Sequence, residues 1–135
     1  MLKFLNLDCM SESKIYPDSF EHFHRLQSLY RRMENNTDPA KEILLVLRSQ
    51  SGDKEAFDEL LKSVQTQLWR YISSLVGDRE ISADILQEVF LILYRKIGWL
   101  HNPELFRAWA YRIASRESFR YLKKEARWRE HIRDH

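Results

Sequence analysis

The stretch that decides the fold reads GDKEAFDELLKSV at residues 52–64, ISADILQEVFLILYRKIGWL at residues 81–100, and LFRAWAYRIASRESFRYLKK at residues 105–124. In each segment apolar residues recur every three or four positions, which is the period of an amphipathic helix. The outer faces differ: the first is plain, the second carries carboxylates and an amide, and the third is basic and aromatic. This order predicts a small helical module in which one helix binds a protein and another binds nucleic acid.

The composition restricts the fold class. The chain has 135 residues, of which 44% are hydrophobic and 13% aromatic, enough for one domain with a core of its own. Glycine and proline occur only three times each, and strand-like alternation is hard to find. We therefore predict an all-α fold, a compact helical bundle of three core helices with additional N-terminal helices.

Three parts of the chain are expected. Residues 1–38 form an N-terminal helical extension, residues 39–128 the main domain, and residues 129–135 the start of a linker or tail. A helix begins at Asp38-Pro39, because proline is tolerated in the first turn. The residues expected to face the core from this helix are Ile43, Leu44 and Leu47.

The boundaries of the later helices follow from capping residues. Asp53 is expected to cap a helix that ends at Gly77. A second helix spans about residues 81–97, and a loop covers Gly98–Glu104, because glycine and Asn-Pro interrupt the helical pattern there. The last helix begins near Leu105.

Several functional classes find no support. Cys9 is the single cysteine, and the H-x-H pair at His22 and His24 has no third ligand, so neither a disulfide framework nor a metal site is expected. No motif for a cofactor or for catalysis is present. No apolar run is long enough for a bilayer, and the N-terminus does not resemble a signal sequence, so a cytoplasmic protein without membrane insertion is expected.

One face of the helix at residues 81–97 is suited to docking. On a wheel of about 100° per residue, two carboxylates, an amide, an exposed leucine and an arginine lie opposite the buried stripe. The acidic groups could pair with cations of a partner around a desolvated leucine. An ordinary solvated face is the alternative. The residues of this face are Asp84, Gln87, Glu88, Leu91 and Arg95.

The last helix carries a cationic stripe. From His101 onward the chain has nine Lys or Arg and five Asp or Glu, a local balance of +4. Cations one turn apart repel each other unless an anion neutralises them, and phosphates are the natural partner. A solvated helix face is again the alternative. The stripe consists of Arg112, Arg116, Arg120, Lys123, Lys124 and Arg127, and Trp109 is expected to be exposed among these residues.

These segments resemble region 2 of bacterial RNA polymerase sigma factors of the extracytoplasmic-function (ECF) type. The similar stretches are GDKEAFDELL at residues 52–61, SADILQEVFLILYRKI at residues 82–97 and FRAWAYRIASR at residues 106–116. They occur in the order and spacing of the family. The resemblance covers roughly Leu44 to Arg127.

The resemblance implies two binding partners. In the family the acidic helix grips the coiled coil of the polymerase β′ subunit, so the face at Asp84–Arg95 would bind core RNA polymerase. The last helix would engage the non-template strand of the promoter −10 element, and the loop before it would capture a flipped base. An anti-sigma factor is a further expected partner, and no cofactor is implied. The residues expected to contact DNA are Trp99, His101, Asn102, Arg107, Trp109, Arg112, Arg116, Arg120, Lys123, Lys124 and Arg127.

The chain departs from the family pattern in three places. Ala110 stands where leucine is usual, and Ala114-Ser115-Arg116 stands where the family has asparagine after an Ala-Arg pair. The family's second helical domain, which reads the −35 element, has no counterpart in residues 128–135. A sigma-like module that binds polymerase or an anti-sigma factor without directing initiation is therefore an alternative. A helical protein that binds duplex DNA is another, and an enzyme is the least supported class.

Overall fold

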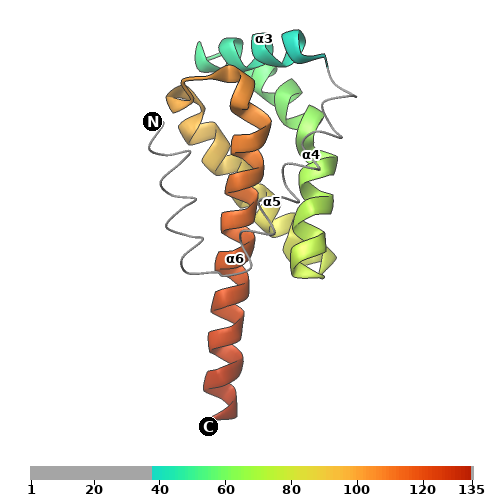
Figure 1. Ribbon diagram of the computed structural model, residues 1–135, viewed down its shortest axis with the longest axis vertical. Coiled ribbons are helices and arrows are strands. Elements are labelled where there is room, and N and C mark those ends of the chain that lie inside the picture. The colour runs from blue at the N-terminus through green and yellow to red at the C-terminus, as the bar shows by residue number, and fades with distance from the viewer. Residues whose placement is uncertain (1–37, 135) are drawn as a thin grey trace.

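The computed structural model describes residues 38–134, and the expected N-terminal helical extension lies outside them apart from Asp38. Within this range the chain is all helical, without a strand, as the sequence predicts. Helix α4 packs against α3, α5 and α6 (Figure 1). The elements are α3 (Pro39–Gln50), α4 (Lys54–Val76), α5 (Arg79–Lys96), the short 3₁₀ helices η1 (Ile97–Trp99) and η2 (Pro103–Leu105), and α6 (Phe106–Arg133).

Aspartates begin three of these helices. The side chain of Asp38 accepts a hydrogen bond from Ala40 N, and that of Asp53 accepts one from Ala56 N, each at 3.1 Å. Asp78 accepts from Glu80 N and Ile81 N, so α5 begins two residues earlier than predicted. Each carboxylate satisfies backbone donors that have no partner within the helix.

Gly77 ends α4 in a left-handed conformation, with φ at +80°. Its backbone N–H donates to the carbonyl of Ser73 at 2.9 Å. A side chain at this φ would be strained, so glycine allows the sharp turn into α5. The predicted cap is confirmed.

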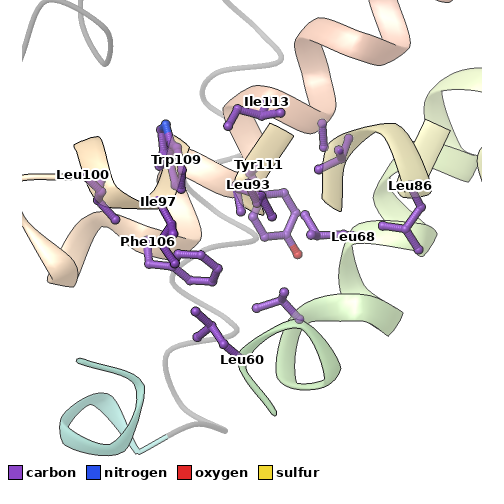
Figure 2. Packing of buried hydrophobic residues seen from close by; sticks show 14 of the residues in the cluster. Leu60, Leu68, Leu86, Leu93, Ile97, Leu100, Phe106, Trp109, Tyr111 and Ile113 are labelled. Atoms are coloured by element: carbon purple, nitrogen blue, oxygen red, sulfur yellow. The ribbon is translucent and has the colours of Figure 1, made fainter. Parts of the chain in front are cut away.

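The core is built from buried side chains of α3, α4, α5 and α6, together with Ile97 of η1 and Leu100 after it. Figure 2 shows Leu60 and Leu68 of α4, Leu93 of α5 and Tyr111 of α6 converging on it. Fully burying side chains of this size contributes roughly 1.5–3 kcal/mol each. The core thus fixes how the three long helices present their outer faces.

The inward face of α3 differs from the prediction. Leu45 and Val46 are buried, whereas Leu44 and Leu47 are exposed. The face toward the bundle also includes Glu42 and Gln50, which make polar contacts with α6 and with η1. Because two polar residues occupy this face and the whole run at residues 43–47 is apolar, periodicity alone pointed to the wrong side.

The C-terminal part of α6 extends beyond the bundle (Figure 1). Its last buried residue is Ser118, although the helix continues to Arg133. None of the helices at residues 38–134 is long and apolar enough to cross a membrane.

Candidate functional site

The outer face of α5 forms a mixed polar and apolar surface. Its acidic residues Asp84 and Glu88 are exposed, and Gln87, Leu91 and Arg95 are exposed beside them. The opposite side of α5 buries Ile85, Leu86, Val89 and Leu93 in the core. The five residues singled out by the helical wheel therefore share one accessible surface, which we call the α5 face.

A groove of about 500 Å³ lies beside the α5 face, between α4 and α5. Its apolar lining includes Tyr94, which is 56% exposed and packs edge-on against Phe57 with ring centroids 5.4 Å apart. Tyr94 is not among the docking residues predicted from the helical wheel, although it lies three residues after Leu91 and so on the same side of the helix. The lining residues are Lys54, Phe57, Asp58, Leu61, Gln87, Phe90, Leu91 and Tyr94.

The segment between α5 and α6 is more ordered than a simple loop. Trp99 is 58% exposed, and His101 and Asn102 are exposed with it. Asn102 begins η2 by accepting a hydrogen bond from Glu104 N at 3.2 Å. The side-chain amide of Gln50 donates to the carbonyls of Ile97 and Leu100, which ties this segment to α3.

Arg107 is not on the surface, contrary to its expected place among DNA contacts. The residue is 2% exposed, and its Nε donates to Glu42 Oε1 at 2.7 Å. Its Nη1 and Nη2 are buried with no hydrogen-bond partner among the described residues. Burial raises the pKa of Glu42, and the positive charge and hydrogen bond of Arg107 oppose that rise. Arg107 therefore joins α3 to α6 as part of the interior.

Trp109 is also buried, so the prediction that it stands exposed among arginines is wrong. It is 2% exposed and packs edge-on against Phe106, with ring centroids 6.2 Å apart. Figure 2 shows it beside Leu100 and Ile97. Ile97 belongs to η1 and Leu100 directly follows that helix, so periodicity within α6 alone could not reveal that Trp109 is buried.

The remaining basic residues form a graded stripe along α6. Arg112 and Arg116 are half-buried, whereas the cations further along are exposed. Arg120 Nη1 lies 3.4 Å from Glu117 Oε1 and keeps most of its side chain in solvent. We call the exposed set the α6 stripe. It consists of Arg120, Lys123, Lys124 and Arg127.

Two of the residues that depart from the ECF pattern contribute to the interior of the bundle. Ala110 is fully buried. Ser115 Oγ lies 2.7 Å from the hydroxyl of Tyr71 and donates to the carbonyl of Tyr111 at 2.9 Å. Ser115 thus links α6 to α4 within the bundle. Burial raises the pKa of the Tyr111 hydroxyl.

Comparison with known proteins gives one family. The sigma-70 region 2 family model matches residues 60–128, a range that contains the α5 face, the η1–η2 segment and the α6 stripe. No solved structure matches the chain significantly.

Several curated bacterial sigma factors are similar to this chain. The RNA polymerase sigma-H factor of Pseudomonas aeruginosa is 36% identical over 83 residues, 62% of this chain and 43% of the relative. The ECF RNA polymerase sigma-E factor of Haemophilus influenzae is 35% identical over 94 residues, 70% of this chain and 47% of the relative. The ECF RNA polymerase sigma-E factor of Escherichia coli is 32% identical over 84 residues, which are 62% of this chain and 44% of the relative. The chain thus spans less than half the length of these relatives. Because the family model matches just over half of the chain, the chain belongs to the sigma-70 region 2 family.

Proposed function

We propose that this chain acts in transcription initiation, by docking on core RNA polymerase through the α5 face and by holding the −10 region of a promoter with α6 and the η1–η2 segment. Every step of this function is binding, and no bond is made or broken. The observation that carries the proposal is the exposed α5 face within the part of the chain that matches the family.

The α5 face has the makeup of a protein-docking surface. Asp84 and Glu88 offer two negative charges one helical turn apart, and Leu91 adds an apolar centre. The adjoining groove extends this apolar area toward Tyr94. Charges at the rim of such a surface steer a partner, and apolar side chains at its centre provide most of the affinity. A basic helix or coiled coil of core polymerase is the partner of matching chemistry.

The α6 stripe supplies contacts to a DNA backbone. Arg120, Lys123, Lys124 and Arg127 are exposed on one helix, and phosphates would relieve their mutual repulsion. Arg112 and Arg116 lie closer to the bundle, where they could meet a strand that approaches the η1–η2 segment. These contacts would position DNA without reading its sequence.

The η1–η2 segment is the proposed reader of a base. It presents Trp99 and His101 to solvent and is held in place by Gln50. Extruding a base costs a few kcal/mol, which stacking and hydrogen bonds in a pocket must offset. The exposed indole of Trp99 can stack on a base, and the imidazole of His101 can form hydrogen bonds with one.

The anti-sigma factor remains a predicted partner.

Charge reversal tests the docking assignment. In Asp84→Lys and Glu88→Lys, the helical fold should persist, because both side chains are exposed, while binding to core polymerase should be lost. The measurement is co-elution with core polymerase together with circular dichroism. Lys62→Glu, which reverses an exposed charge on α4, is the matched control and should bind normally. Normal binding by both α5 variants would overturn the assignment.

Strand preference tests the DNA assignment. The complex with core polymerase should bind the single-stranded non-template −10 sequence more tightly than the same sequence as duplex. A helical protein that reads the major groove would show the reverse preference. Duplex preference would therefore contradict this part of the proposal.

A further inference from the structure

The end of α6 carries an exposed aromatic surface outside the bundle. Trp128 is 62% exposed and Ile132 is 56% exposed, and no residue of α6 after Ser118 is buried. Figure 1 shows this part of the helix projecting away from the other elements. Packing of the bundle therefore does not account for a tryptophan at this position.

The surroundings of Trp128 form a shallow site with a volume of about 480 Å³. The rings of Trp128 and His131 lie side by side, with centroids 6.1 Å apart and planes 33° from parallel. One carboxylate borders the site, and Arg129 neutralises it, with Nη2 2.9 Å from Glu125 Oε1. The residues of this site, which we call the α6 tip, are Tyr121, Lys124, Glu125, Arg127, Trp128 and His131.

The charge of the α6 tip selects the class of ligand. Lys124 and Arg127 flank the aromatic rings, and both are exposed. Cations beside an exposed indole are suited to a single-stranded nucleic acid, which offers both phosphates and unpaired bases. A second copy of the same positively charged helix would be repelled. In duplex DNA the bases are stacked inside the helix. The phosphates of a duplex could contact the cations, but its bases could not stack on the indole.

We propose that the α6 tip binds single-stranded DNA, with Trp128 stacking on an unpaired base and with Lys124 and Arg127 contacting the adjacent phosphates. This inference rests on the proposed function and extends its DNA surface. Trp128 lies eight residues after Arg120, about 12 Å further along the helix at 1.5 Å per residue. A strand held by the α6 stripe would therefore reach the tip without leaving the helix.

The test measures the affinity of the chain, in complex with core RNA polymerase, for a fluorescently labelled single-stranded non-template −10 oligonucleotide and for the same sequence as a duplex. Trp128→Ala should weaken single-strand binding about 5- to 150-fold, the range for one stacked base. Trp128→Phe should restore most of the affinity, because it keeps an aromatic ring. Ile132→Ala removes an apolar side chain from the same projecting turn and is the matched control, which should bind normally. Duplex affinity should be unchanged in all three variants.

Several outcomes would overturn the inference. Unchanged single-strand affinity in Trp128→Ala excludes stacking, and an equal loss on duplex points to a nonspecific effect. A wild-type dimer that Trp128→Ala dissociates would assign the tip to a second copy. A Trp99→Ala variant separates the two proposals: if it loses single-strand binding while Trp128→Ala does not, the proposed function stands and this inference fails. If the wild-type complex binds no single strand, both fail.

Discussion

Gln50, the last residue of α3, holds Leu100 in the η1–η2 segment. The side-chain amide of Gln50 donates to the carbonyl of Leu100 at 2.7 Å and to that of Ile97 at 2.9 Å. Both carbonyls lie just after α5, where the helical hydrogen-bond pattern ends. Gln50, which precedes this segment by about fifty positions in the sequence, therefore holds the backbone that carries Trp99 and His101.

Replacing Gln50 by alanine should loosen this segment. Two hydrogen bonds are lost, although the carbonyl of Ile97 keeps the one from Leu100 N, and the free energy of unfolding should fall by about 1–3 kcal/mol. Discrimination between promoters should fall more than affinity for core polymerase, because the α5 face is untouched. Chemical denaturation and competition between promoters measure the two effects. Gln65→Ala, at an exposed amide on α4, is the control. Unchanged promoter discrimination in Gln50→Ala would contradict the role of this contact.

Arg107 should behave as an interior residue. Arg107→Met leaves the partly buried carboxylate of Glu42 without its cation, which should destabilise the protein by about 3–5 kcal/mol. The double variant Glu42→Leu/Arg107→Met removes both charges and should recover most of the loss. Denaturant unfolding measures both. If Arg107→Met instead folds normally and loses only DNA affinity, the residue belongs to the DNA surface after all.

The residues that could be predicted from the sequence share a simple property. On α4, apolar residues that recur every three or four positions from Phe57 to Ile72 mark the side that is buried, and on α5 the residues of the predicted docking face are exposed. In both helices nearly every inward residue is apolar, so one helix alone contains the information. The groove between α4 and α5 is lined by residues of both helices. The pattern of α4 alone therefore indicates only that Phe57 and Leu61 are apolar residues of the core side.

Residues in α3 and at the start of α6 could not be placed in this way. The inward side of α3 includes Glu42 and Gln50, whose partners are distant in the sequence. Trp109 and Arg107 lie beside basic residues in α6, but their surroundings come from η1, α3 and the segment around Leu100. Trp128, which shares the same mixture of aromatic and basic neighbours, is exposed because no described element covers it. Tertiary contacts, and not helical periodicity, distinguish the two tryptophans.

Asp53 should make the stability of the protein depend on acid. The hydrogen bond from Ala56 N, and then the contacts from Arg48, hold the pKa of Asp53 below its ordinary value of 3.8. Arg48 Nη2 lies 2.6 Å from Asp53 Oδ2. Because the folded-state pKa is lowered, this stabilisation is complete above the unfolded value and is lost as the pH falls through the folded value.

The matched variant for this effect is Asp53→Asn, which can still cap α4 but does not titrate. Above pH 3.8 the wild type should have the higher melting temperature, and the difference should shrink at lower pH. Thermal unfolding followed by circular dichroism at several pH values measures it. A difference that stays constant down to the lowest pH would show that Asp53 does not contribute through its charge.

Tyr94 should contribute to polymerase binding through the groove beside the α5 face. It is 56% exposed and is held edge-on by Phe57, so it presents a fixed apolar edge next to Leu91. Aromatic anchors at the centre of an interface commonly cost 2 kcal/mol or more when truncated, so Tyr94→Ala should weaken binding to core polymerase about 30-fold or more. Leu44→Ala is the control, because Leu44 is 55% exposed on α3 and lies outside the groove. Titration of labelled protein with core polymerase compares the two variants, and their melting temperatures establish that both are folded. Equal, small losses in the two variants would show that the polymerase does not enter the groove and would confine docking to the charged residues of the α5 face.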